Sequence, residues 1–257
     1  MSATVSFKRH PLVKSAQKVQ KRFRKRVQKS AAGSQKKFRR WARATLEAGY
    51  YRYNLWRWYW QGKLTLRRSD ATFNVYLREQ LKETLLKRRL FDRARGDVVP
   101  LIDMLASKYD FTNQSILCVG CRNDTEIRYF RSRGAGHVVG IDLYQAGADI
   151  VIMDMHDLKF GDSTVDVVYS RHSFEHSYDT RKAALEFVRV VKPGGVVVVE
   201  VPGKHQGGGD YNYFTCLEDV LEPFTPHVGE FLWKEYSLKE ENTFGFDIIR
   251  LMFRVNK

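Results

Sequence analysis

The second half of the chain alternates between short apolar runs and amphipathic stretches. The apolar runs are rich in β-branched residues, and helical patterns at 124–133 and 180–191 lie between some of them. Nearly all-apolar strands that alternate with helices are typical of a parallel sheet that is buried on both faces. The pattern therefore predicts an α/β fold with strands at 115–119, 137–141, 149–153, 165–169 and 195–201.

Two further strand patterns, near 230–237 and 246–255, are joined by the loop Lys239–Phe246. A hairpin of this kind pairs antiparallel at the edge of a sheet. We therefore expect seven strands, mostly parallel, in a domain formed by residues 111–257.

Helical periodicity precedes these strands. Apolar residues from Phe73 to Leu90 recur at helical spacing, which predicts an amphipathic helix over 71–95. A shorter helix is expected at 98–108. We assign residues 71–110 to a helical lead-in.

The N-terminal part of the chain is strongly basic. Residues 1–46 carry a thin apolar stripe among nearly continuous Lys and Arg, which predicts a basic helical segment within an N-terminal extension of residues 1–70. Residues 1–99 hold 27 Lys and Arg against 6 Asp and Glu, whereas residues 100–257 hold 17 against 23. The basic N-terminal part and the mildly acidic C-terminal part are therefore expected to have different functions.

Seven aromatic residues fall within positions 50–60, next to Arg52 and Arg57. Such rings suit a membrane interface, stacked bases or a protein partner, and they equally suit a lid packed on the folded domain. The basic segment before them suits a solvated tail, an anionic lipid surface or a phosphate backbone. Residues 1–62 thus predict either an anionic membrane surface or RNA as a partner.

Cysteine usage and the start of the chain bear on location. Cys118, Cys121 and Cys216 are too few for a disulfide framework, which favours an intracellular setting. No apolar run approaches the roughly 20 residues needed to span a bilayer. We expect a cytoplasmic or membrane-peripheral protein. The absence of acidic residues before Glu47 is also typical of an organellar transit peptide.

Gly120 follows the first predicted strand, where the chain must turn into a helix. Glycine permits a tight turn and a close approach of the backbone to a ligand. Asn123 and Glu126 are spaced like a capping box, which leaves backbone N–H groups facing that ligand. Asp142 ends the second strand, where a carboxylate can accept hydrogen bonds from both hydroxyls of a ribose.

The chain contains counterparts of five short sequence motifs, in the same order and with the same spacing: "VGCG", "GID", "D-x-x-x-L-x-F", "LEH" and "KPGG". The chain therefore resembles the class I S-adenosylmethionine (SAM)-dependent methyltransferases, particularly their small-molecule group, over residues 112–202. This resemblance implies a Rossmann-like sheet and SAM as the cofactor. The phrases here are VGCR at 119–122, GID at 140–142, DMHDLKF at 154–160, FEH at 174–176 and KPGG at 192–195.

The resemblance also implies a role for each matching position. The two aspartates involved could equally be ordinary strand-end or turn carboxylates. The implied cofactor residues are Gly120 for the methionine part of SAM, Asp142 for the ribose with Leu143 at the same site, Asp154 and Met155 flanking the adenine, and Ser170 beside the bound cofactor.

The chain departs from the family pattern in its first motif. Arg122 and Asp124 stand where the family usually has its second and third glycines. Their side chains take up room beside the cofactor. Arg122 could compensate by pairing with the SAM carboxylate, or it could block the site. We expect retained binding, because the ribose and adenine positions are intact.

Methyl transfer to an alcohol requires alignment, exclusion of water and a base. The candidate bases are His172 and His176, which follow the fourth strand, and His205 in the loop after the fifth. His176 could instead only order a loop. Cys118 and Cys121 have a metal-ligand spacing, but no second pair follows them, so we expect no metal site.

Two hypotheses on function follow. In the first, a SAM-dependent methyltransferase modifies a small-molecule, lipid or saccharide acceptor, and its N-terminal segment docks it to a membrane. In the second, a methyltransferase fold binds RNA or a ribonucleoprotein through its basic arm, either methylating RNA or without activity. The first is favoured because the motifs are closest to those of small-molecule methyltransferases. The acceptor is not evident from the sequence.

Overall fold

The computed structural model describes residues 49–50, 52–64, 70–91 and 95–257. The basic segment 1–46 thus lies outside the described residues. The chain forms two compact units, of which the first ends at Arg57 and the second is Trp58–Lys257. Among the described helices, none combines the length and the apolar character needed to cross a membrane.

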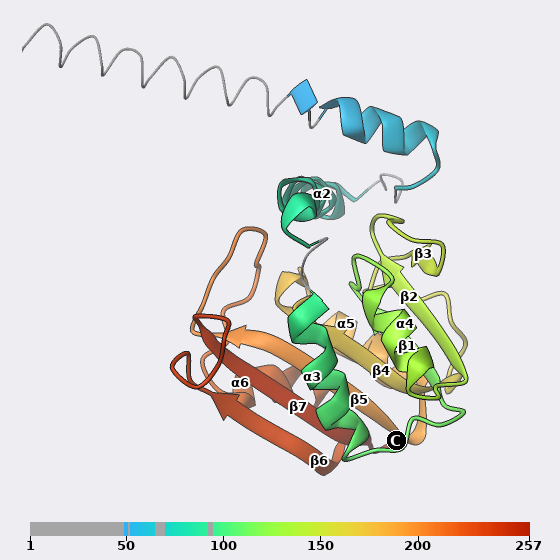
Figure 1. Cartoon of the computed structure of the whole chain (residues 1–257), viewed down its shortest axis with the longest axis vertical. Coiled ribbons are helices and arrows are strands. Elements are labelled where there is room, and N and C mark those ends of the chain that lie inside the picture. The colour runs from blue at the N-terminus through green and yellow to red at the C-terminus, as the bar shows by residue number, and fades with distance from the viewer. Residues whose placement is uncertain (1–48, 51, 65–69, 92–94) are drawn as a thin grey trace, which may run out of the picture. The chain divides into compact units, whose positions relative to one another are not determined.

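The second unit is built on a seven-stranded sheet with the order β3-β2-β1-β4-β5-β7-β6 (Figure 1). The first five strands pair in parallel, and β7 pairs antiparallel with both β5 and β6. The predicted α/β fold with an antiparallel edge hairpin is confirmed. The strands are β1 (Ser115–Val119), β2 (His137–Asp142), β3 (Ile150–Ile152), β4 (Val165–Arg171), β5 (Val191–Gly203), β6 (Val228–Ser237) and β7 (Asp247–Val255).

Most helices agree with the periodicity of the sequence, with shifted ends. The first helix ends at Phe91 rather than 95, and the next begins at Arg95 rather than 98. Three short elements were not predicted, because three to five residues are too few to show a period. The helices are α2 (Ala71–Phe91), α3 (Arg95–Ala106), α4 (Thr125–Ser132), α5 (Thr180–Val190) and α6 (Leu217–Leu221), with 3-10 turns η1 (Phe174–His176) and η2 (Glu222–Phe224).

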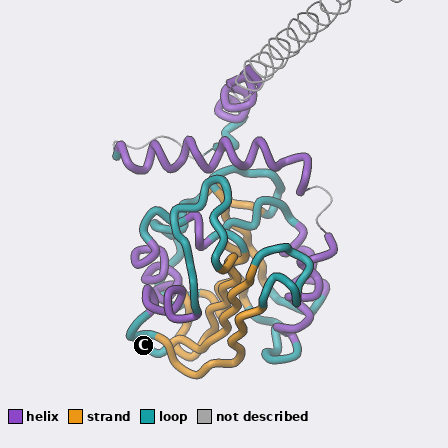
Figure 2. The backbone as a smooth tube through the Cα atoms, turned by 90° about the vertical axis from the view of Figure 1, so that its left-hand side faces the viewer, coloured by secondary structure: helices purple, strands orange, loops and turns teal. Residues whose placement is uncertain are grey.

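Helices cover both faces of the sheet, as Figure 2 shows. Successive side chains of a strand point to opposite faces, so one apolar strand serves two cores. Ile116 of β1 packs with Phe130 of α4 in one cluster, and Leu117 packs with Phe187 of α5 in the other. This double burial explains why the central strands are almost wholly apolar.

The end of the aromatic run, from Trp58 onward, belongs to the second unit. Residues 52–60 are helical, and Trp58 is buried against Tyr144 with ring centroids 3.8 Å apart. Helix α2 packs on the loops that follow the strands: the ring of Tyr76 lies 4.9 Å from that of Tyr178, and Gln80 Nε2 donates to the Gly209 carbonyl at 2.7 Å. Helix α2 therefore covers the sheet edge at which Asp142 lies.

Candidate functional site

Two cavities lie where β1, β2, β4 and β5 end. The larger has a volume of about 350 Å³ and the smaller about 50 Å³. They share Gly120, Arg122, His172 and His176 in their walls. Ligands of open α/β sheets bind at this edge, outside the carboxyl ends of the strands.

Gly120 shapes the junction between the two cavities. Its φ is 67°, in the left-handed region that favours glycine. A Cβ at this position would overlap the side chain of Ser173, which follows β4. Any larger residue would therefore push apart the turns that follow β1 and β4.

The smaller cavity gathers most of the residues expected to bind the cofactor. Asp142 accepts hydrogen bonds from the backbone N–H groups of Arg122 at 3.1 Å and Tyr144 at 3.3 Å. Burial raises the pKa of Asp142, and the nearby Arg122 partly offsets that rise. Leu143 and Met155 line the same cavity. The structure thus brings together a carboxylate, a guanidinium and apolar walls.

Asp154 and Ser170 lie behind these walls and line neither cavity. The Asp154 carboxylate is buried and pairs with His156 Nδ1 at 2.6 Å, and His156 Nε2 lies 2.7 Å from Ser177 Oγ. The Ser170 hydroxyl is buried and hydrogen-bonded to Ser173 Oγ at 2.7 Å. In this structure both side chains hydrogen-bond to protein groups behind the cavity walls, and their expected contact with the cofactor remains a prediction.

Arg122 occupies the position at which the family pattern has a glycine, and its φ is 48°. Burial lowers the pKa of its guanidinium, an effect opposed by Asp142 and Glu175. The smaller cavity is well below the roughly 300 Å³ at which ligand pockets begin. Cofactor entry beside Asp142 therefore requires a shift of Arg122 or of α2, whose Tyr76 also lines this cavity.

A buried cluster of charges lies beside the larger cavity. Glu200 of β5 contacts Arg171 Nε at 2.9 Å, Arg250 Nε at 2.6 Å and His172 Nε2 at 3.2 Å. Burial alone would raise the pKa of Glu200, but these cations outweigh it and lower the pKa to about 2. Sequence reasoning missed this cluster, although Glu200 interrupts an apolar strand, because its partners lie on other strands.

All three candidate bases line the larger cavity. Burial lowers the pKa of His172, but Glu175 and Glu200 outweigh it and raise the pKa to about 9. His172 is therefore expected to carry a proton at neutral pH, and it would have to lose that proton before it could act as a base. Burial likewise lowers the pKa of His176, and Asp210 more than compensates, so that this pKa is also raised.

His205 has different surroundings. Its ring stacks on that of Phe246 with centroids 4.5 Å apart, and Phe246 lines the same cavity. The ring is partly exposed. His205 thus borders the cavity through a ring stack, whereas His172 and His176 contact carboxylates.

We predict that the charge on His172 stabilises the fold. Its folded-state pKa of about 9 lies above the ordinary 6.5, so the contribution is present at neutral pH and is lost as pH rises through 9. Between pH 7 and pH 10, the unfolding free energy of the wild type should fall by about 1–3 kcal/mol more than that of His172→Asn. Urea denaturation at each pH measures the difference. His227→Asn, in a histidine outside the cavities, is the control, and equal pH dependence of His172→Asn and wild type would contradict the assignment.

Comparisons with known proteins agree with the motifs. Residues 117–199 match a family described as a methyltransferase domain. The chain is 29% identical over 139 residues to malonyl-[acyl-carrier protein] O-methyltransferase 1 of Coxiella burnetii, which covers 48% of this chain and 49% of that protein. It is 26% identical over 141 residues to the chloroplastic tocopherol O-methyltransferase of Arabidopsis thaliana, which covers 49% of this chain and 38% of that protein. The chain thus spans half or less of the length of these relatives.

A solved structure shows the same fold. It is 1,6-didemethyltoxoflavin-N1-methyltransferase of Burkholderia thailandensis, with a TM-score of 0.58 and 14% identity, covering 76% of this chain and 94% of that one. The strand order, the five motifs in register and the family match all agree. Residues 117–199 therefore form a domain of the class I SAM-dependent methyltransferase type.

Proposed function

We propose that the protein transfers a methyl group from SAM to a small-molecule acceptor bound in the larger cavity. The observation that carries the proposal is the junction at Gly120, where a narrow cavity lined by the Asp142 carboxylate meets a wider one. SAM supplies a methyl group already activated on a sulfonium. Asp142 and Arg122 would hold the cofactor, and the walls of the two cavities would exclude water and align the acceptor.

The chemistry of the larger cavity supports an acceptor that is partly apolar and partly polar. Phe244 and Phe246 provide rings, while Arg171 and His172 provide positive charge. Both curated relatives are named as O-methyltransferases, which favours an oxygen atom as the site of methylation. His205 would then accept the proton that the acceptor oxygen loses.

We predict that Asp142→Ala weakens binding of SAM and of S-adenosylhomocysteine by about 10- to 100-fold, because hydrogen bonds to a charged group contribute roughly 1.5–3 kcal/mol. The wild type is expected to bind at micromolar level, about −8 kcal/mol. Calorimetric titration of the full chain measures both. Asp157→Ala, which removes a carboxylate paired with Lys159, should bind like the wild type. Unchanged affinity in Asp142→Ala, or no binding by the wild type, would refute the cofactor site.

We also propose that the N-terminal segment docks the protein on an anionic membrane surface. In the aromatic run, Trp56 and Trp60 are 61% and 70% exposed, and Tyr53 and Tyr59 are exposed as well. Exposed Trp and Tyr beside arginines are typical of membrane interfaces. The surplus of Lys and Arg in residues 1–46 would add attraction to anionic lipid.

The double variant Trp56→Ala/Trp60→Ala tests this docking, and it leaves Trp58 on its partner Tyr144. We expect the wild type to sediment with vesicles that contain phosphatidylserine and not with neutral ones. The variant should lose several-fold in affinity, since each exposed ring contributes apolar area to the interface. The proposal fails if the wild type does not sediment with either kind of vesicle and instead binds RNA with an affinity that depends steeply on salt, as expected of an RNA-binding arm.

A further inference from the structure

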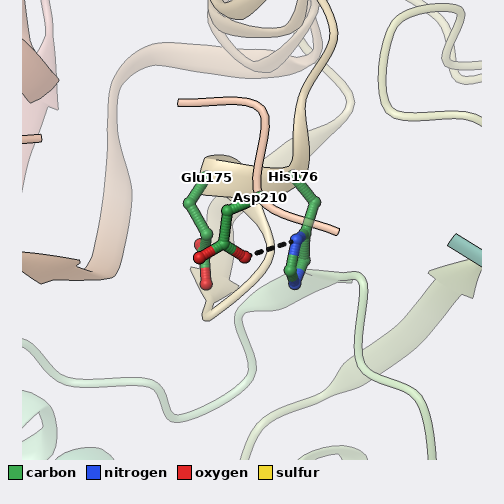
Figure 3. Close-up of side chains that lie close together, drawn as sticks. All are labelled: Glu175, His176 and Asp210. Atoms are coloured by element: carbon green, nitrogen blue, oxygen red, sulfur yellow. Dashed lines mark ion pairs between the residues drawn. The ribbon is translucent and has the colours of Figure 1, made fainter. Parts of the chain in front are cut away.

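Two segments far apart in the sequence bring a histidine and two carboxylates together at the wall of the larger cavity (Figure 3). Glu175 and His176 lie in η1, and Asp210 lies in the loop after β5. One ligand atom from each lies within 4.8 Å of the others. Atoms on opposite sides of a divalent cation are about 4.2–5 Å apart, because metal–ligand distances are roughly 2.1–2.5 Å. The spacing therefore fits a single ion.

A second observation points to a ligand at this place. Glu175 is 3% exposed, and in the described part of the chain its Oε2 has no hydrogen-bond partner. Burial of a carboxylate oxygen without a partner is costly, and such oxygens in native proteins normally have one. Figure 3 shows this carboxylate beside that of Asp210. A cation between the two carboxylates would supply the missing partner.

The backbone holds the two segments in place. The Glu175 carbonyl accepts hydrogen bonds from the N–H groups of Tyr211 and Asn212, each at 3.0 Å. Asp210 Oδ2 accepts the N–H of Gly207, and its Oδ1 lies 3.0 Å from His176 Nδ1. The three side chains are thus presented by a preformed frame, which lowers the entropic cost of ordering a metal site.

We propose that Glu175, His176 and Asp210 bind one divalent first-row cation, with Mn²⁺ as the probe. Two carboxylates and one imidazole are suitable ligands for such an ion. When the cation binds, the proton that lies between His176 Nδ1 and Asp210 is released to solvent. This proposal departs from our expectation from the sequence that the chain holds no metal.

The place of the site suggests what the cation does. All three ligands line the larger cavity, so coordination positions remain open on the cavity side. An oxygen of the acceptor could fill one of them and be polarised and oriented there. This role rests on the proposed methyl transfer, whereas binding of the cation does not.

The test is a titration of the full chain with Mn²⁺ in the absence of SAM, followed by the electron paramagnetic resonance signal of the free ion. We expect one Mn²⁺ per chain in the wild type. Glu175→Gln and Asp210→Asn should each weaken binding at least tenfold. Glu230→Gln removes an exposed carboxylate paired with Arg254 and should bind like the wild type.

Circular dichroism shows whether each variant is folded, and the two ligand variants provide independent tests. The proposal is overturned if the wild type binds no Mn²⁺ at about 1 mM, or if the folded ligand variants bind as tightly as the wild type. In that case the three residues serve only to hold the loop after β5 against η1. Because the titration contains no SAM, a failure of the cation site and a failure of the cofactor site are separate results.

Discussion

The close contact between Gly120 and Ser173 sets the geometry on which the whole site depends. From β1 the chain adds β2 and β3 on one side, and it then returns to the other side of β1 to form β4 and β5. The strand order therefore reverses between β1 and β4. A crevice forms at such a switch point, and its width is fixed by how closely the two following turns approach. Ser173 Oγ donates to the Val119 carbonyl at 2.8 Å, which ties the end of β1 to the turn after β4. Only a residue without a Cβ allows this approach.

Electrostatics then divide the crevice into two chemically different parts. Around Asp142, one carboxylate and one guanidinium face apolar side chains, an arrangement suited to a ligand with hydroxyls and a carboxylate. Around Glu200, one buried anion is surrounded by Arg171, Arg250 and His172. A buried charge is tolerated only with such partners, because removal of one partner leaves an uncompensated charge. The positive groups at the wall of the larger cavity are thus held in place by an anion beneath them.

Much of the fold could be predicted because its signals are local. Apolar runs, the glycine after β1 and the aspartate that ends β2 all lie within a few residues of the structure that they specify. What the sequence did not reveal depends on contacts between distant segments. Glu175 lies near Asp210 because the loop after β5 contacts η1, and Glu200 lies beside Arg250 because β5 pairs with β7. His156, whose ring contacts the Asp154 carboxylate, is only two residues away in sequence, yet nothing in the periodicity indicates that this aspartate faces inward. The segment 1–46 lies outside the described residues, and its basic helix remains a prediction.

A crystal structure of the full chain with S-adenosylhomocysteine would show both the cofactor contacts and the response of Arg122. We expect the ribose hydroxyls to lie on the Asp142 carboxylate, the cofactor sulfur to face the larger cavity, and Arg122 or α2 to have shifted so that the guanidinium contacts the cofactor. A saturated crystal in which the ligand is absent, or bound away from Asp142, would refute this cofactor site.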